Sequence, residues 1–259
     1  MIAKLFSKRR VRQPDATLPQ GQRVYAVGDI HGRCDLLDML LDQIARDDAE
    51  RGDAETMLIF LGDLIDRGPE SAQVVERLRQ LAETRPAQST RFLLGNHEEV
   101  FLAALAGSVK ALKFFNRIGG RETILSYGVP EALYRNADYE ELLEELQAKV
   151  PAEHIRFLQG FEDLILAGDY VFVHAGIRPG TPLTHQRVSD LRWIREEFMG
   201  FTGAHEKIVV HGHTITDEVD VQAWRIGLDT GAFASGKLSG MGFEGNQRWL
   251  LQADSVTVS

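Results

Sequence analysis

The segment that decides the fold is MLIFLGDLIDRG, residues 57–68. Its first five residues form a continuous apolar run, typical of a buried strand, and the run stops at Gly62-Asp63. An apolar run followed by glycine and a polar residue also occurs at residues 24–29 and 92–96. Apolar residues at helical spacing follow the runs at residues 24–27 and 57–61, so strand, turn and helix repeat at an interval of about thirty residues. This alternation predicts a mostly parallel sheet covered by helices.

The second half of the chain is rich in predicted strands. Apolar runs at residues 164–166, 170–173, 208–210, 223–228 and 249–251 indicate a second sheet packed against the first. Residues 101–161 read as helical, with an amphipathic pattern at residues 139–150. We therefore expect an α/β fold of two packed β-sheets flanked by helices. It would form a single domain over residues 23–259, with a helical cap or insertion at about 101–161, after a flexible basic tail at residues 1–22.

Composition restricts the possible functions. The 259 residues carry a formal net charge of -9, which argues against a nucleic acid as the main partner. Cys34 is the single cysteine, so an intramolecular disulfide is excluded and a reducing cytoplasm is the expected location. No run of about 18 apolar residues exists, so no membrane span is predicted. The sequence leaves the oligomeric state open.

Five short polar segments each follow a strand-like run, and glycine accompanies all of them. They are residues 28–32 (GDIHG), 62–68 (GDLIDRG), 95–98 (GNHE), 173–176 (VHAG) and 211–214 (HGHT). Taken alone, each polar residue is more often a turn, cap or hydrogen-bonded structural residue. Together they place carboxylates, imidazoles and an amide at the ends of strands, where open α/β sheets bind ligands.

This mixture of ligand types suits Mn²⁺, Fe or Zn²⁺ better than Ca²⁺, which prefers oxygen alone. Two ions about 3.5–4 Å apart can clamp the attacking and leaving oxygens of a displacement at phosphorus. One carboxylate normally bridges such a pair, and Asp63, in the central segment, is the predicted bridge.

In this order, the five segments resemble the signature of the calcineurin-like metallophosphoesterases, especially their serine/threonine phosphoprotein phosphatase branch, which includes bacteriophage-type phosphatases. The resemblance covers residues 24–238. It implies an α/β/β/α sandwich and a hydrolase of phosphoric esters that uses two divalent metal ions. Mn²⁺ is the expected metal, with Fe or Zn²⁺ as alternatives.

The resemblance also implies a role for each site residue. Six residues would be metal ligands: Asp29, His31, Asp63, Asn96, His174 and His213. The first two would bind one ion, the last three would bind the other, and Asp63 would bridge. Four residues would act on the substrate: His97, Asp66, Arg67 and Arg195. His97 would be the general acid, oriented by Asp66, and the two arginines would hold the substrate phosphate.

The pattern departs from the family at two positions. Ile215 stands where many metallophosphoesterases carry a further histidine ligand, so His211 is expected to lie behind the ligands rather than among them. Leu94 stands where protein phosphatases usually carry an arginine. Arg192 is the less favoured alternative to Arg195. Residues 227–231 and 237–238 resemble the family's closing strands and are assigned a structural role.

The predicted activity is that of a serine/threonine protein phosphatase, acting on a phosphorylated protein or a small phosphoester. The first alternative is a hydrolase of diadenosine tetraphosphate or a related dinucleoside polyphosphate. Those enzymes typically lack the Asp of Asp-Arg-Gly and carry Asp after Gly-Asn-His, so Asp66 and Glu98 favour the phosphoprotein branch. A catalytically silent regulatory scaffold is disfavoured because every site residue is present. A nucleic-acid phosphodiesterase is disfavoured by the net charge.

Overall fold

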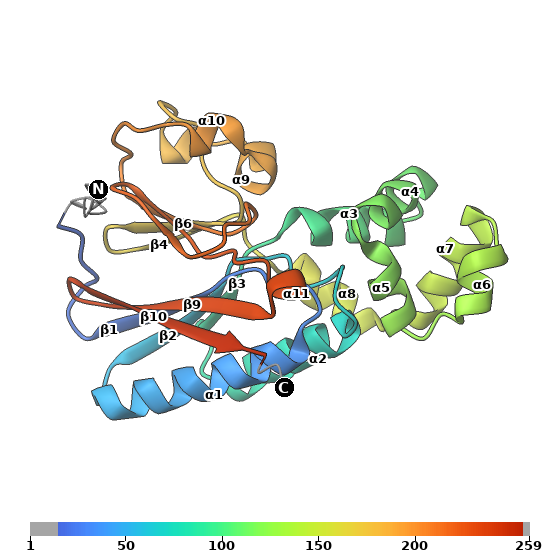
Figure 1. Ribbon diagram of the computed structural model, residues 1–259, viewed down its shortest axis with the longest axis horizontal. Helices are drawn as coiled ribbons and strands as arrows, with labels where there is room; N and C mark the ends of the chain where they lie inside the picture. The colour runs from blue at the N-terminus through green and yellow to red at the C-terminus, as the bar shows by residue number, and fades with distance from the viewer. Residues whose placement is uncertain (1–14, 256–259) are drawn as a thin grey trace, which may run out of the picture.

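The computed structural model describes residues 15–255, in which two five-stranded sheets pack face to face (Figure 1). The first sheet has the order β10-β9-β1-β2-β3 and the second β4-β5-β6-β8-β7. The strands of the first sheet are β1 (Gln22–Val27), β2 (Glu55–Phe60), β3 (Thr90–Phe92), β9 (Lys237–Glu244) and β10 (Gln247–Asp254). Those of the second are β4 (Leu164–Ala167), β5 (Tyr170–Val173), β6 (Ile208–His211), β7 (Asp220–Val221) and β8 (Arg225–Gly227).

Each sheet combines a parallel centre with antiparallel edges. In the first sheet β1, β2 and β3 are parallel, whereas β9 and β10 run antiparallel to their neighbours. In the second, β5, β6 and β8 are parallel, and β4 and β7 are the antiparallel edge strands. Because the parallel strands of each sheet point the same way, their carboxyl ends gather at one edge of that sheet. The predicted fold class, two packed sheets flanked by helices, is confirmed.

Helices cover the outer face of each sheet. On the first sheet lie α1 (Cys34–Arg51) and α2 (Ser71–Thr84), and on the second lie α9 (Val188–Trp193) and α10 (Glu196–Met199) (Figure 1). The buried residues of α1 recur at helical spacing: Leu36, Leu37, Leu40, Leu41 and Ile44. Burying one such side chain contributes about 1.5–3 kcal/mol. The periodic apolar face therefore fixes which side of α1 meets the sheet.

The strands alternate between two apolar environments. Tyr25 and Val27 of β1 pack in the cluster that contains α1, whereas Val24 and Ala26 pack in the cluster shared with the second sheet. Phe172 of β5 belongs to the same inter-sheet cluster. With both faces covered, the strands read as continuous apolar runs, which is why the sequence reveals them clearly.

Six helices lie between β3 and β4, where the sequence predicts a helical stretch. They are α3 (Asn96–Leu105), α4 (Val109–Ile118), α5 (Gly120–Ser126), α6 (Glu131–Asn136), α7 (Tyr139–Lys149) and α8 (Ala152–Gln159). In Figure 1 most of this group stands beside the two sheets rather than over either outer face. Two shorter elements complete the chain: the 3-10 helix at Leu183–His185 and α11 (Ala232–Ser235).

The prediction of a flexible tail over residues 1–22 is wrong for its described part. Ala16 and Leu18 are 3% and 2% exposed and belong to the inter-sheet core. The N–H of Leu18 donates to the carbonyl of Gly245 at 2.9 Å, and the N–H of Asp169 donates to the carbonyl of Thr17 at 3.0 Å. Two apolar residues among turn-forming residues are too few to predict this packing from the sequence. Residues 1–14, with their basic side chains, lie outside the described residues.

Within residues 15–255, no helix has both the length and the apolar character needed to cross a membrane.

Candidate metal centre

The predicted site residues lie at the carboxyl ends of strands from both sheets. Backbone hydrogen bonds tie their loops together: the N–H groups of Ile30 and His31 both donate to the carbonyl of Asp63, at 3.1 and 2.9 Å. Across the second sheet, the N–H of Gly212 donates to the carbonyl of His174 at 2.8 Å. The loops that carry the predicted ligands are therefore held in register by main-chain contacts.

Backbone strain concentrates at this place. Of the described non-glycine residues, six have a positive φ, and five of these are predicted site residues: His31 (46°), Asp63 (50°), Asp66 (74°), Arg67 (67°) and His213 (64°). Such conformations cost about 1–3 kcal/mol each and persist only where the surroundings impose them. The loops are thus fixed in shapes that aim particular side chains rather than in relaxed turns.

Close packing of backbone against side chain adds to this rigidity. A Cβ atom on Gly95 would stand 2.2 Å from Oδ1 of Asp63 and 2.5 Å from Oε2 of Glu98. No other residue type fits between these carboxylates, which explains the glycine before Asn96.

Two groups of ligand-type atoms share Asp63. Within residues 15–255, the ligand atoms of His31, Asp63 and His97 lie within 4.8 Å of one another, as do those of Asp63, His174 and His213. All five residues are buried. Oδ2 of Asp63 is 3.8 Å from Nε2 of His31, and Oδ1 is 3.4 Å from Nε2 of His174. Although burial opposes its ionised form, the facing His174 and His97 hold the pKa of Asp63 well below its usual value.

The histidine tautomers suit metal binding. Nδ1 of His31 lies 2.7 Å from the carbonyl of Ile65, and Nδ1 of His174 lies 2.7 Å from the carbonyl of Leu61. Each Nδ1–H donates to its carbonyl, so each ring turns Nε2 toward Asp63. A carbonyl that fixes one ring nitrogen while the other faces a cation is the usual environment of a metal-binding histidine.

Several acceptor atoms here have no donor, which tests whether a cation fits. Oδ1 of Asp29 and Nε2 of His213 are buried and form no hydrogen bond. Oδ1 of Asn96 lies 3.1 Å from Nε2 of His174, an approach that needs a proton or a cation between the two atoms. Unpartnered buried acceptors are costly unless a positive charge satisfies them. The residues present therefore fit a site for divalent ions.

Asp29 is placed differently from the other predicted ligands. Its Oδ2 accepts the N–H of His213 at 2.9 Å, and it belongs to neither three-residue group. Burial, followed by the charges of Asp229 and Asp63, raises the pKa of Asp29 well above its usual value. The structure thus brings Asp29 to the site, against the backbone of His213.

His97 and Asp66 form a tight pair. Nδ1 of His97 lies 2.5 Å from Oδ2 of Asp66, and the other oxygen of Asp66 accepts the hydroxyl of Thr123 at 2.6 Å. Although burial opposes the charged ring, Asp63 and then Asp66 raise the pKa of His97. Nε2 of His97 lies 3.0 Å from Nη2 of Arg67.

Arg67 reaches into the centre. Its Nη1 donates to Nε2 of His31 at 3.0 Å, and its guanidinium stands 4.9 Å from the ring centroid of Phe233. Half-buried between two histidines and an aromatic ring, this guanidinium lies where an anionic substrate would meet the centre.

The two candidate arginines of α9 and its following turn are distinguished by their partners. Arg192 is engaged by Asp163 and Glu99, at 2.7 and 2.8 Å. Arg195 is exposed, and its Nη1 donates to the carbonyl of His213 at 2.9 Å. It also lines a cavity of about 350 Å³ together with Trp193 and Arg178. Arg195 is therefore anchored beside a predicted ligand while its side chain remains exposed.

The sequence does not reveal the structural role of Glu98 or the buried position of Asp229 at the site. Glu98 is fully buried and accepts backbone N–H groups from Asp63 and Gly95 with Oε2, at 2.9 and 3.0 Å, and from Leu64 with Oε1 at 2.8 Å. It fixes the Asp63 loop and faces away from open space, so it says little about substrate class. Asp229 is also buried at this edge, in a segment that the sequence analysis treated as structural. Only its position directly after a strand-like run could have drawn attention to it.

We expect Glu98→Gln to lower the free energy of unfolding by about 3 kcal/mol, because the amide NH₂ would face backbone N–H groups in place of a charged acceptor. Since Glu98 does not reach the substrate, the ratio of kcat/KM for a phosphopeptide to that for a dinucleotide should stay unchanged. Urea unfolding and parallel kinetics measure the two effects. Glu99→Gln, at a half-buried position of the same helical turn, is the control; its amide oxygen can still accept from Arg192 or Trp193, so it should cost less than about 1 kcal/mol. A changed substrate ratio would contradict this role.

His211 lies outside both three-residue groups. Its ring packs edge-on against Phe198 at 5.0 Å, on the α10 side of the second sheet, with Nδ1 2.9 Å from the carbonyl of Gly212.

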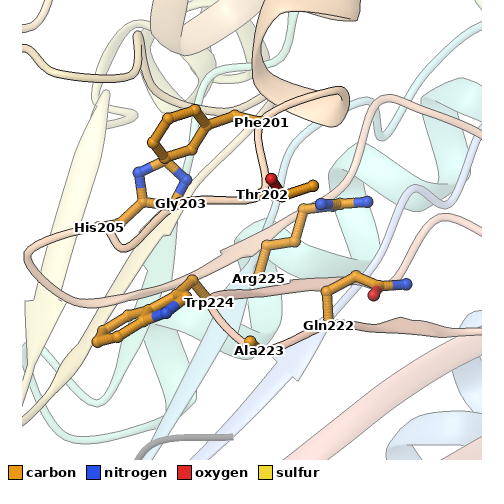
Figure 2. A pocket seen from close by; sticks show the side chains of 8 residues that line it. All are labelled: Phe201, Thr202, Gly203, His205, Gln222, Ala223, Trp224 and Arg225. Carbon is orange, nitrogen blue, oxygen red and sulfur yellow. The ribbon is translucent and has the colours of Figure 1, made fainter. Parts of the chain in front are cut away.

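A separate cavity of about 180 Å³ lies between the segment after α10 and the β7–β8 connection, and it contains none of the predicted site residues (Figure 2). Phe201, His205 and Trp224 are the rings that line it.

The family described as calcineurin-like phosphoesterase matches residues 22–253. The symmetrical bis(5'-nucleosyl)-tetraphosphatase of Acidovorax sp. (strain JS42) is 31% identical over 72% of this chain and 51% of its own length. The asymmetrical bis(5'-nucleosyl)-tetraphosphatase PrpE of Bacillus subtilis (strain 168) is 24% identical over 84% of this chain and 89% of its own. The chain spans about half the length of the symmetrical relatives that it matches.

Solved structures share the fold. One provisionally described as a diadenosine tetraphosphatase superposes with a TM-score of 0.62 at 22% identity, covering 92% of this chain and 98% of that one. The cold-active protein-tyrosine phosphatase of a psychrophilic Shewanella species gives a TM-score of 0.53 at 18% identity, over 93% of this chain and 83% of that one.

Proposed function

Because the chain belongs to the calcineurin-like phosphoesterase family, we propose that it is a metal-dependent hydrolase of dinucleoside tetraphosphates. The observation that carries the catalytic part is the position of Asp63, the member common to both groups of ligand-type atoms. Two divalent ions, with Mn²⁺ expected, would supply an activated water and neutralise charge on the phosphoryl group. The proposed ligands are Asp29, His31, Asp63, Asn96, His174 and His213.

The chain's own side chains perform the remaining steps. His97, with Nδ1 held by Asp66, offers Nε2 as the proton donor to the leaving oxygen. Arg67, lying between the two histidines of the first group, neutralises the transferring phosphoryl group. Arg195 extends this positive surface toward the next phosphate of a polyphosphate chain. Buried loops with imposed backbone shapes keep these groups in place without rearrangement during the reaction.

The proposed substrate class rests on the relatives. Both symmetrical and asymmetrical tetraphosphatases of bis(5'-nucleosyl) compounds are similar to this chain. By sequence, Glu98 favours the phosphoprotein branch. Its carboxylate, however, binds backbone N–H groups of the Asp63 loop, so its identity does not distinguish between the two substrate classes. A phosphoprotein phosphatase is the second candidate, favoured by the Asp66–His97 pair, since Asp66 belongs to that branch's pattern.

Parallel turnover of diadenosine tetraphosphate and a phosphoserine peptide by the manganese-loaded enzyme tests the substrate. We expect kcat/KM to favour the dinucleotide by at least about tenfold. Chromatography of the products then separates two modes of cleavage: ADP alone means symmetrical cleavage, whereas AMP with ATP means asymmetrical cleavage. A preference for the peptide would overturn the proposed substrate and support the second candidate.

Arg195→Ala is expected to lower kcat/KM for the dinucleotide by about 10–100-fold, the loss of one charge-assisted phosphate contact. Arg192→Ala is the matched control, because its guanidinium is engaged by Asp163 and Glu99. That variant should retain its kcat/KM and lose some thermal stability. Steady-state kinetics and thermal unfolding of both variants provide the measurement. Equal losses of activity in the two variants would show that the contribution is structural.

A further inference from the structure

Asp229 lies at the same edge as Asp29. Asp229 stands two residues beyond the end of β8, as Asp29 stands two beyond the end of β1. The preceding residues are in backbone contact: a Cβ atom on Gly28 would stand 2.4 Å from the carbonyl oxygen of Leu228. The N–H of Leu228 also donates to the carbonyl of His211 at 2.8 Å. The fold thus brings two aspartates of distant sequence to neighbouring chain segments.

Each of these carboxylates has one oxygen without a partner. Asp229 is 1% exposed, and its Oδ1 accepts the N–H of Gly231 at 2.9 Å. Asp29 is also 1% exposed, and its Oδ2 accepts the N–H of His213. The other two oxygens, Oδ1 of Asp29 and Oδ2 of Asp229, are buried and form no hydrogen bond. A purely structural role would explain the hydrogen bond that Oδ1 of Asp229 accepts. It would not explain why Oδ2 is buried without a partner, which costs desolvation free energy.

The Asp229 segment also occupies the place beside Ile215, the position at which many metallophosphoesterases carry a further histidine. The N–H of Thr216 donates to the carbonyl of Asp229 at 3.0 Å. A Cβ atom on Gly231 would stand 3.1 Å from Cγ2 of Ile215. The aromatic ring of Phe233, in the following turn, lies edge-on to His31 with centroids 5.4 Å apart. The segment therefore reaches from Ile215 to a proposed ligand of the first ion.

We propose that Asp229 supplies an additional oxygen ligand to the first metal site, beside Asp29 and in place of the histidine that Ile215 replaces. The inference rests on the proposed metal-dependent function. A divalent cation would satisfy both unpartnered oxygens and separate two like charges. Carboxylate oxygen is an ordinary ligand of Mn²⁺. Oδ1 keeps its hydrogen bond to Gly231, which would orient the carboxylate toward the ion.

The test compares Asp229→Asn with the wild-type chain, both freed of metal with EDTA. Asparagine preserves the acceptor for Gly231 and removes the charge. Mn²⁺ binding, followed by electron paramagnetic resonance and calorimetry, should show two sites in the wild type. In the variant, one of the two should be weakened about 10–100-fold. Asp190→Asn, which alters a buried carboxylate paired with Arg178, is the control and should bind both ions normally.

Thermal unfolding of the metal-free proteins supplies an independent readout. Because the substitution removes one of two like charges, metal-free Asp229→Asn should be at least as stable as metal-free wild type, and Mn²⁺ should stabilise it less. Unchanged Mn²⁺ affinity together with a lower melting temperature would overturn the proposal and make Asp229 a structural cap.

If Asp229→Asn does not fold, the Mn²⁺ affinity of Asp229→Ser is measured instead, with the same expected loss at one site. A wild type that binds no Mn²⁺ would overturn the inference and the proposed metal centre together, whereas unaltered affinity in the variant overturns the inference alone.

Discussion

Asp63→Asn is expected to abolish tight binding of both metal ions and to lower kcat/KM by roughly a thousandfold, about 4 kcal/mol of transition-state stabilisation. Asp63 is the member that the two groups of ligand-type atoms share, so its neutralisation affects both. The substitution is well matched to the backbone. Asparagine tolerates the positive φ of 50° at this position, and its amide oxygen can still accept the N–H of His97.

Metal analysis by mass spectrometry and steady-state kinetics measure this effect. Asp190→Asn again serves as the control for a buried carboxylate away from the proposed ligands, and it should retain two ions per chain. Circular dichroism establishes that Asp63→Asn is folded. A folded Asp63→Asn protein that still holds two ions would contradict the bridging role.

His97→Asn is expected to lower kcat by about 10²–10⁴-fold, the usual contribution of a general acid, while two metal ions remain bound. Nδ1 of His97 is occupied by Asp66, and Nε2 is the only ring nitrogen that can transfer a proton. The loss of kcat in His97→Asn should be smaller for an aryl phosphate, because its phenolate leaving group needs no proton. Because the pair acts as a unit, adding Asp66→Asn to His97→Asn should cost little more.

The competing role for His97 is that of a ligand. Its Nε2 lies 3.9 Å from Oδ2 of Asp63, nearly the same distance as Nε2 of His31. Kinetics with alkyl and aryl substrates, together with metal content, distinguish the roles. Loss of an ion in His97→Asn, with equal deficits for both substrates, would move His97 from acid to ligand.

The sequence predicts the parts of this protein that depend on local pattern. The runs at residues 24–27, 58–61 and 170–173 are buried on both faces, so each can be recognised as a strand from its own residues. The turns after them carry glycine because backbone and side chains crowd there, as Gly95 against Asp63 illustrates. Predicted metal ligands from five different strand ends meet because the parallel strands of each sheet end at one edge.

The parts that escaped prediction depend on partners distant in sequence. Glu98 follows Asn96 and His97 in a motif, and nothing local reveals that its carboxylate accepts the N–H groups of residues 63 and 64. Asp229 resembles an ordinary turn residue until its buried, unpartnered oxygen is found on a segment whose backbone contacts that of the Asp29 segment. Ala16 and Leu18 are buried because they pack into the apolar cluster between the two sheets. In each case the deciding contact spans tens of residues or more, beyond the reach of periodicity.

The most direct test of the central claim is turnover of diadenosine tetraphosphate by EDTA-treated enzyme as Mn²⁺ is added back, with Asp63→Asn in parallel. The account predicts no turnover without metal, full activity once two ions are bound per chain, and no recovery by the variant at the same Mn²⁺ concentration. Undiminished turnover in the presence of EDTA, or recovery of Asp63→Asn to the wild-type rate, would contradict it.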